Sequence, residues 1–341
     1  MNRKLRRISL CVALALAASA CAKSGTGPTV VVQANQPGQK VKIALILPSS
    51  KGDMSWSQGM YEGVMAFQKE QGEDTVQVQV SQNLSKPSEA GAAIRDYAVR
   101  KFDIIIAHSS QFQSMVLDIA KEFPDRLFAY GAGSQAAMNV YAYDPQAQMG
   151  AYVMGIAAAT LTKSKIVGII GPAQTGDATK YNTGFKAGVA VTNPNIKVLE
   201  SYTGSPDNTL RAKEIAQAYV ERGADLLTGT GPQTVGPIQA AAEKPGVYWL
   251  ASDVDQSNLA PNTVLMAQTY HWKDVVKTLV DNRTRGVKGG QVLTLDFANG
   301  RVKLVINPRL ADKMPVELKA KIDQTQKDIA SSKITVPLPS K

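Results

Sequence analysis

The side chains best suited to covalent or metal chemistry are scarce in this chain of 341 residues. It has two histidines, His108 and His271, and two cysteines, Cys11 and Cys21. These residues do not have the spacing of a metal site, and no Gly-x-Ser-x-Gly nucleophile motif occurs. The glycine-rich stretch GTGPQTVG lacks the Lys-Ser/Thr pair of a phosphate-binding loop. The composition therefore favours reversible binding over catalysis, and we expect no cofactor.

Polar residues that could contact a ligand follow the short apolar runs of the sequence. If these runs are strands of a parallel sheet, ligands are expected just beyond their carboxyl ends, where loops and helix N-termini present free N–H groups. The residues at such positions that we select as candidates are Asp53, Trp56 and Ser57 after KIALIL, Ser109 and Ser110 after DIIIAH, Gly231 in TGTGPQT, and Asp253 after VYWLAS.

Three of these candidates have alternative structural interpretations. Ser55 and Gln58 fit a capping box, which would place Trp56 in the first turn of a helix, where a flat ring can stack on a ligand. The alternative is a hydrophobic staple of Trp56 against its own helix. Asp253 could accept hydrogen bonds from ligand hydroxyls or amines, or it could cap the next turn. Asp53 could likewise serve only to form its turn.

Apolar runs and helical spacings alternate along the chain from Lys42 onward. The runs KIALIL, VQVQVS, DIIIAHS and RLFAYGA predict strands, and the alternation restarts at KIVGIIG. This pattern predicts an α/β fold with two similar parallel-sheet units. Between them, AYVMGIAAATL is too short to cross a bilayer and predicts a tightly packed helix.

The later elements are predicted from local signals. Asp207 is expected to cap the helix that begins there. The stretch QVLTLDFANGRVKLVI predicts a β-hairpin with ANGR as its turn. A polar helix is expected from about Pro315 to Ile329.

The N-terminus indicates export. Four positive charges in the first seven residues precede the apolar run ISLCVALALAA and the small residues ASAC, as in a secretory signal peptide over residues 1–20. The end of this segment resembles a bacterial lipobox, which would make Cys21 an acylated first residue on a flexible tether, 21–40. The alternative is ordinary cleavage near ASA, with Cys21 incidental.

The net charge does not indicate a nucleic-acid partner. The chain carries +10, of which the signal segment contributes four. No dense run of lysine and arginine follows Cys21, so we expect no nucleic-acid binding. The remaining surplus would favour mild attraction to anionic lipid beneath an anchor.

Six collinear stretches resemble the BMP family of lipoproteins, also called basic membrane proteins or PnrA-like. They are GDMSWSQGMYEG, VLDIAKEFPDRLFAY, QMGAYVMGIAAATLTKSKIVGIIG, GFKAGVAVTNPNIKV, YTGSPDNTLRAKEIAQAYVERGADLL and ASDVDQSNLAPNTVLMAQ. The resemblance runs from about Val41 to Val280. It implies a type I periplasmic-binding-protein fold, with two Rossmann-like lobes joined by a three-segment hinge. We expect an N-terminal lobe of 41–143 plus about 269–288, and a C-terminal lobe of about 144–268 plus 289–341.

The resemblance also assigns roles to particular residues. Trp56 stands at the family's first ligand-stacking aromatic position, which is usually phenylalanine, and Ser57 stands where asparagine is frequent. Asp253 matches the aspartate expected to accept ligand hydroxyls. Tyr270 falls near the expected ribose-binding lysine, and we include it among the candidate ligand-binding residues.

Three departures from the family pattern bear on the ligand. Leu47 and Pro48 occupy a region where nucleoside receptors tend to have an aspartate, Pro206 replaces an aromatic residue, and Tyr270 replaces the lysine. Tyr270 or Tyr202 could supply a second ring. Fewer ribose contacts would favour a free base or another small polar ring compound.

The function implied is that of a lipid-anchored solute-binding protein of an ABC importer, facing the periplasm or cell exterior and without enzymatic activity. Its expected partners are a purine nucleoside, purine base or similar ligand, an ABC permease, and the bilayer through Cys21. We expect a monomer. Two alternatives remain: a sensor or interaction lipoprotein of the same fold without transport, and an extracytoplasmic nucleoside-processing enzyme.

Overall fold

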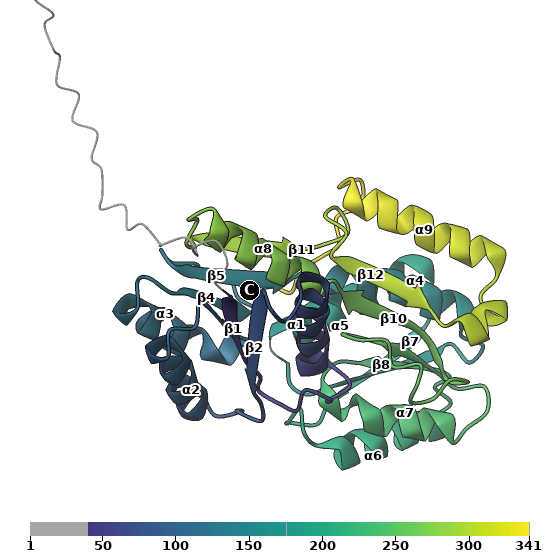
Figure 1. The fold of residues 1–341 in the computed structure, drawn as a ribbon. Coiled ribbons are helices and arrows are strands. Elements are labelled where there is room, and N and C mark those ends of the chain that lie inside the picture. Colours follow the sequence, from purple (N-terminus) through teal and green to yellow (C-terminus); the bar gives the residue numbers. More distant parts are fainter. Residues whose placement is uncertain (1–39, 175, 341) are drawn as a thin grey trace, which may run out of the picture. The chain divides into compact units, whose positions relative to one another are not determined.

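Two parallel sheets organise the part of the chain described by the computed structural model, residues 40–174 and 176–340 (Figure 1). The two α/β units predicted from the alternating pattern are confirmed. The predicted signal peptide, the tether and Cys21 lie outside the described residues. Within residues 40–174 and 176–340, no helix has the length and apolar character needed to cross a membrane.

The first lobe contains a six-stranded sheet in the order β11-β5-β4-β3-β1-β2, and all its neighbouring strands are parallel. Its strands are β1 (Val41–Ile46), β2 (Val76–Ser81), β3 (Ile104–Ala107), β4 (Leu127–Gly131), β5 (Val140–Pro145) and β11 (Gln291–Leu295). Its helices are α1 (Trp56–Gln71), α2 (Pro87–Val99), α3 (Gln113–Glu122) and α8 (Trp272–Thr284). The apolar residues of α1 and α8 pack on one face of the sheet, and those of α2 and α3 pack on the other.

The second lobe has a sheet in the order β12-β10-β9-β8-β6-β7, parallel except where β12 pairs antiparallel with β10. Its strands are β6 (Ile166–Gly171), β7 (Lys197–Tyr202), β8 (Leu226–Gly229), β9 (Tyr248–Ala251), β10 (Val264–Tyr270) and β12 (Val302–Ile306). Its helices are α4 (Ala147–Leu161), α5 (Gly176–Thr192), α6 (Thr209–Glu221), α7 (Val235–Ala242) and α9 (Val316–Ala330). Helices α4, α5 and α9 contribute to one apolar cluster, and α6 and α7 to the other.

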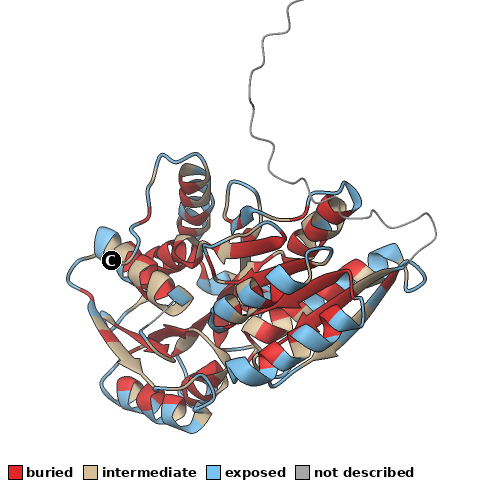
Figure 2. Ribbon diagram, turned by 90° about the vertical axis from the view of Figure 1, so that its left-hand side faces the viewer, coloured by how far each residue is buried: buried red, intermediate tan, exposed pale blue. Residues whose placement is uncertain are grey.

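The central strands are covered on both faces, which explains their uninterrupted apolar sequences. All four residues of β3 and the last four residues of β1 are buried. Figure 2 shows that buried residues predominate along the inner strands, whereas the helices also carry exposed residues. A strand with helices on both sides has no solvent-facing positions, so it lacks the polar alternation of a half-exposed strand. The edge strand β2 does alternate: Gln77 and Gln79 are exposed, whereas Val76 is buried and Val78 and Val80 are half-buried.

Helices α4 and α5 pack with their backbones in close contact. A Cβ atom added at Gly188 of α5 would lie 2.0 Å from the carbonyl oxygen of Tyr152 in α4, and one at Gly184 would lie 2.2 Å from that of Gln148. Most residues of α4 are buried. The prediction that AYVMGIAAATL forms a tightly packed helix is therefore confirmed.

The chain crosses between the lobes three times, between β5 and α4, between β10 and α8, and between β11 and β12. The hairpin predicted for the last pair is wrong, because β11 pairs with β5 while β12 pairs with β10. The turn itself is present: Asn299 donates its backbone N–H to Asp296, and its side-chain amide donates to the carbonyl of Thr294. The strands on either side of it separate into different sheets.

This crossing also corrects the predicted lobe boundary, since β11 lies within 289–341 yet belongs to the first sheet. A second local prediction was wrong as well. Asn208, not Asp207, caps α6, because the Asn208 side chain accepts the backbone N–H of Arg211 at 3.1 Å.

Candidate functional site

A cavity of about 250 Å³ lies where loops from the carboxyl ends of strands in both lobes meet. Six of the eight candidate ligand-binding residues line it: Trp56, Ser109, Ser110, Gly231, Asp253 and Tyr270. The other residues that line it are Ala132, Ala147, Pro172, Gly176, Asp177, Ala178, Tyr181 and Thr230. Strand-end position located five of these lining residues and the family resemblance added Tyr270, which places the cavity where ligands are expected in parallel α/β sheets.

Asp53 and Ser57 lie outside this lining and serve the start of α1. Asp53 Oδ1 accepts the backbone N–H of Ser55 at 2.9 Å and that of Gln58 at 3.0 Å. Its Oδ2 accepts the N–H of Ser57 at 3.1 Å and also the hydroxyl of Ser49. Ser57 is fully buried, with its hydroxyl 2.6 Å from that of Ser49. Asp53 thus satisfies N–H groups that the first turn of a helix leaves without partners.

The predicted capping box is wrong because Asp53 takes the capping role. The Ser55 side chain makes no capping bond and instead donates to Asp253 Oδ2 in the other lobe, at 2.6 Å. The side-chain amide of Gln256 makes a second contact between the lobes, donating to the carbonyl of Met54 at 2.8 Å. The N-terminus of α1 therefore links the two lobes beside the cavity.

Trp56 is held by His108, a residue at the end of β3. The two rings stack at 4.2 Å with an interplanar angle of 9°. The indole N–H donates to the His108 carbonyl at 2.8 Å, and Nε2 of His108 lies 2.9 Å from the Trp56 carbonyl. Since a carbonyl can only accept, Nε2 carries the proton, and Nδ1 accepts from the Tyr143 hydroxyl at 2.7 Å. Burial lowers the pKa of His108 to about 3, so the ring is neutral.

These contacts bear on the staple interpretation of Trp56, whereas its stacking on a ligand stays a prediction. The ring packs on His108 and, edge to face at 5.1 Å, on Trp272 of α8, while also lining the cavity. It is not a staple against its own helix. The sequence reasoning did not give His108 this supporting role, because nothing local to DIIIAHS shows which ring the imidazole meets.

Of the two tyrosines considered as a second ring, only Tyr270 lines the cavity. It lies 6.5 Å from Trp56 in an edge-to-face arrangement, and its hydroxyl accepts from the Gln268 side-chain amide at 2.7 Å. Tyr202 instead donates to Glu200 at 2.5 Å. Tyr181 is a cavity-lining ring that the sequence reasoning missed, since its spacing in α5 marks it only as part of the apolar face.

Two partly buried carboxylates line the cavity, Asp253 and Asp177, and the Asp177 side chain is 21% exposed. Burial raises the pKa of Asp253 to about 6, against the opposing effect of the Ser55 hydroxyl. Burial also raises the pKa of Asp177 to about 6, although the ammonium of Lys180, 3.3 Å away, acts in the other direction. Asp177 was missed as a candidate even though GPAQTGD follows β6. Its position after a strand end was the available signal.

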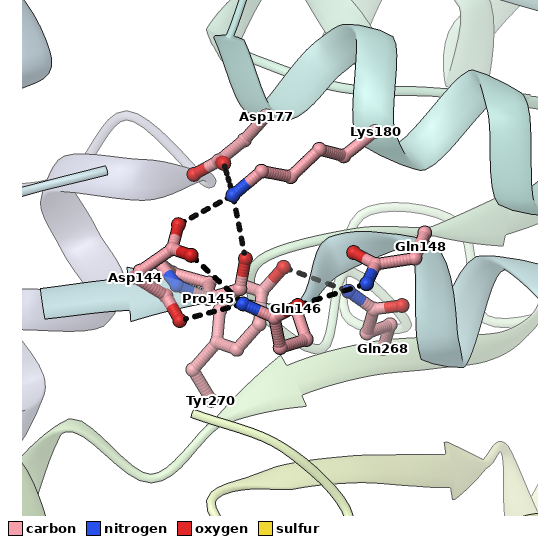
Figure 3. A network of polar contacts seen from close by, with 8 residues as sticks. All are labelled: Asp144, Pro145, Gln146, Gln148, Asp177, Lys180, Gln268 and Tyr270. Carbon is pink, nitrogen blue, oxygen red and sulfur yellow. Dashed lines mark hydrogen bonds and ion pairs between the residues drawn. The ribbon is translucent and has the colours of Figure 1, made fainter. Parts of the chain in front are cut away.

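The Lys180 ammonium is shared between Asp177 and a second carboxylate. Figure 3 shows its ammonium between Asp177 and Asp144, and it also reaches the carbonyl of Pro145 at 3.5 Å. Asp144 in turn accepts from the side-chain amide of Gln146 at 2.8 Å. Asp144 and Pro145 end β5, so this network spans the first crossing between the lobes. Among residues 40–174 and 176–340, no cluster of three metal-ligating side chains occurs.

The raised carboxyl pKa values predict how stability without ligand depends on pH. Between pH 4 and 6 the folded state binds more protons at Asp177 and Asp253 than the unfolded state does, so these groups add stability as pH falls. We expect about 1 kcal/mol per group between pH 7 and 5. The charged groups near Asp177 are Lys180 and Asp144, and the charged group near Asp253 is Asp53.

Urea unfolding at the two pH values tests this effect. The gain on acidification should be smaller in the double variant Asp177→Asn/Asp253→Asn than in wild type, with an exposed-site variant, Asp323→Asn, behaving as wild type. An equal gain in the double variant would show that these carboxyls do not titrate as described.

Comparisons with known proteins agree with this fold. The family model described as "ABC transporter substrate-binding protein PnrA-like" matches residues 40–339. A purine-binding protein of Brucella abortus (strain 2308) is 24% identical over 306 residues, which cover 87% of this chain and 83% of that protein. The transcriptional activator protein med of Bacillus subtilis (strain 168) is 23% identical over 267 residues, covering 78% of this chain and 82% of that protein.

Among solved structures, an ABC transporter solute-binding protein from Conexibacter woesei has the same fold. It aligns with a TM-score of 0.74 and 24% identity, covering 87% of this chain and 99% of that chain. The matching family model spans nearly all of the described residues. The chain therefore belongs to the PnrA-like family of ABC transporter substrate-binding proteins, whose function is to bind a solute outside the cytoplasm and not to catalyse a reaction.

Proposed function

We propose that the protein binds a purine nucleoside or purine base in the cavity between its lobes and delivers it to an ABC permease. The observation that carries this proposal is the placement of Trp56. One face of its indole is covered by the neutral ring of His108, while Trp56 itself lines the cavity. We infer that a flat ligand in the cavity stacks on the opposite face, and stacking on an aromatic side chain favours a base.

The polar lining suits the rest of such a ligand. Asp253 can accept hydrogen bonds from ribose hydroxyls, and the hydroxyls of Ser109 and Ser110 can both donate and accept. A cavity of about 250 Å³ is slightly smaller than the usual range for small-molecule sites, about 300–1,000 Å³, so it suits a base or nucleoside better than a larger molecule. The purine-binding relative of Brucella abortus supports the same class of ligand.

Ligand-driven closure follows from the contacts between the lobes. Ser55 and Met54 of the first lobe contact Asp253 and Gln256 of the second, beside the cavity. A ligand that touches both lobes favours this closed arrangement over an open one, because only the closed form makes all the contacts at once. Closure is thus a hinge movement about the three crossing segments.

A panel of small molecules tests the proposal by thermal unfolding of the purified protein. Adenosine, guanosine, inosine and their free bases are compared with ribose and arabinose. A ligand selective for the native state raises the melting temperature in a concentration-dependent way. We expect at least one purine to do so and neither pentose to do so. If no purine shifts the transition at millimolar concentration, the purine assignment is wrong.

We also propose that Cys21 is acylated and anchors the protein to the outer face of the membrane. The support is the lipobox-like ASAC after an apolar signal segment. Replacing Cys21 by serine should move the protein from the membrane fraction to the soluble fraction of the cell. Retention in the membrane would contradict the anchor.

A sensory role is the second candidate, favoured by the relative named as a transcriptional activator in Bacillus subtilis. Uptake of a labelled purine by cells with and without the protein separates the two roles. Purine binding together with unchanged uptake would favour the sensor.

A further inference from the structure

The cavity is an acidic environment. Asp177 and Asp253 line it, whereas no lysine or arginine is among its lining residues in the described part of the chain. The nearby Lys180 is shared between Asp177 and Asp144, so one ammonium faces two carboxylates. A ligand that enters this space therefore meets excess negative charge in a setting where burial strengthens electrostatic interactions.

Two oxygen atoms of the lining are buried and have no hydrogen-bond partner among the described residues, Oδ2 of Asp177 and Oγ1 of Thr230. The other carboxylate oxygen of Asp177, Oδ1, faces the Lys180 ammonium at 3.3 Å. A buried carboxylate oxygen without a donor is costly, and an N–H or O–H group of a ligand would satisfy it. The hydroxyl of Thr230 can accept a second N–H or donate to the ligand.

Two features fix the position of Asp177, namely its place in the first turn of α5 and its ion pair with Lys180. It lies in the first turn of α5, where the helix dipole favours a negative charge. Lys180, one turn later on the same helix, is held in turn by Asp144 and the Pro145 carbonyl at the end of β5 (Figure 3). Asp177 is thus a fixed hydrogen-bond acceptor, which is what discrimination between similar ligands requires.

We propose, as a refinement that rests on the purine-binding function, that Asp177 selects purines bearing an exocyclic amino group. Adenosine and guanosine present such an N–H₂ group, whereas inosine has only a carbonyl oxygen or a hydrogen at the same positions. A carbonyl oxygen directed at the carboxylate is repelled, so the selection combines an attractive and a repulsive element. The same excess negative charge disfavours phosphorylated purines such as AMP.

Calorimetric titration of the purified protein with adenosine, guanosine, inosine and AMP tests this selectivity. A hydrogen bond to a charged group predicts that the better of the two amino nucleosides binds about tenfold or more tightly than inosine, and that AMP binds at least about tenfold more weakly than adenosine. In Asp177→Asn, which keeps the shape of the side chain but adds an N–H₂ donor, the preference over inosine should fall to about threefold or less. The exposed-site variant Asp323→Asn should keep the wild-type ratios.

The outcomes separate this inference from the proposed function. If wild type binds both amino nucleosides and inosine with similar affinity, or if Asp177→Asn keeps the preference, the role of Asp177 is overturned while purine binding stands. If wild type binds none of the four compounds or their bases, the proposed function itself fails. Should Asp177→Asn not fold, Asp177→Ser removes the same charge and must likewise abolish the preference.

Discussion

Replacing Trp56 by alanine should weaken purine binding by about 10- to 100-fold. Stacking of one base on an aromatic side chain contributes on the order of 1–3 kcal/mol, and the substitution also removes the ring that packs on His108. Titration calorimetry with the tightest-binding purine measures the loss. Trp56→Phe keeps a flat ring and should retain most of the affinity, because phenylalanine can stack on a base in the same way.

Tyr61→Ala is the matched control for this prediction. Tyr61 lies on the same helix with its ring near the ammonium of Lys51, and it is not among the residues lining the cavity. Its loss should leave the affinity unchanged. If Trp56→Ala binds purines as tightly as wild type does, Trp56 is not the stacking platform, and the ligand must lie elsewhere.

Replacing Gly188 by valine should prevent the second lobe from folding. A Cβ atom at this position would lie 2.0 Å from the Tyr152 carbonyl oxygen, which belongs to the backbone of α4 and cannot rotate away. Separating α4 from α5 would open the apolar cluster that both helices bury. The expected loss exceeds about 4 kcal/mol, at the severe end for a single substitution.

Circular dichroism and the yield of soluble protein measure this effect. Gly52→Ala is the control, since a Cβ there would meet only the Ser50 hydroxyl oxygen at 4.0 Å. That variant should unfold at the wild-type temperature. A folded Gly188→Val protein with a melting temperature within a few degrees of wild type would mean that α4 and α5 do not pack as described.

The repeating pattern of the sequence was sufficient to predict the class of fold. Buried parallel strands have apolar sequences and amphipathic helices have a regular spacing, so both kinds of element can be recognised one at a time. The hairpin prediction failed because pairing is not local. The ANGR turn forms, but β11 and β12 find their partners in strands far away in the sequence.

The candidate site was predictable to the extent that position after a strand end determines it. Trp56, Asp253 and Tyr270 were placed in this way or by family resemblance, and all three line the cavity. Side-chain roles within the first turn of α1 were not predictable. Asp53 and Ser55 are both of residue types that cap helices. In the folded protein the second lobe places Asp253 next to Ser55. Ser55 therefore donates to Asp253, and Asp53 caps α1.

Asp177 illustrates what a single sequence conceals. Its type and position after β6 are ordinary for a residue that starts a helix. Its significance comes from a buried carboxylate oxygen without a partner among the described residues and from a lysine that it shares with Asp144. These are properties of the folded arrangement of both lobes.

The central claim is that a purine lies between the lobes against Trp56. The most direct test is a crystal structure of the protein with the purine that gives the largest thermal shift. We predict the base on the face of Trp56 opposite His108, within contact distance of Asp253 and Asp177 in the closed form. A purine bound outside this cavity, or a cavity occupied by a ligand with no ring against Trp56, would contradict the account.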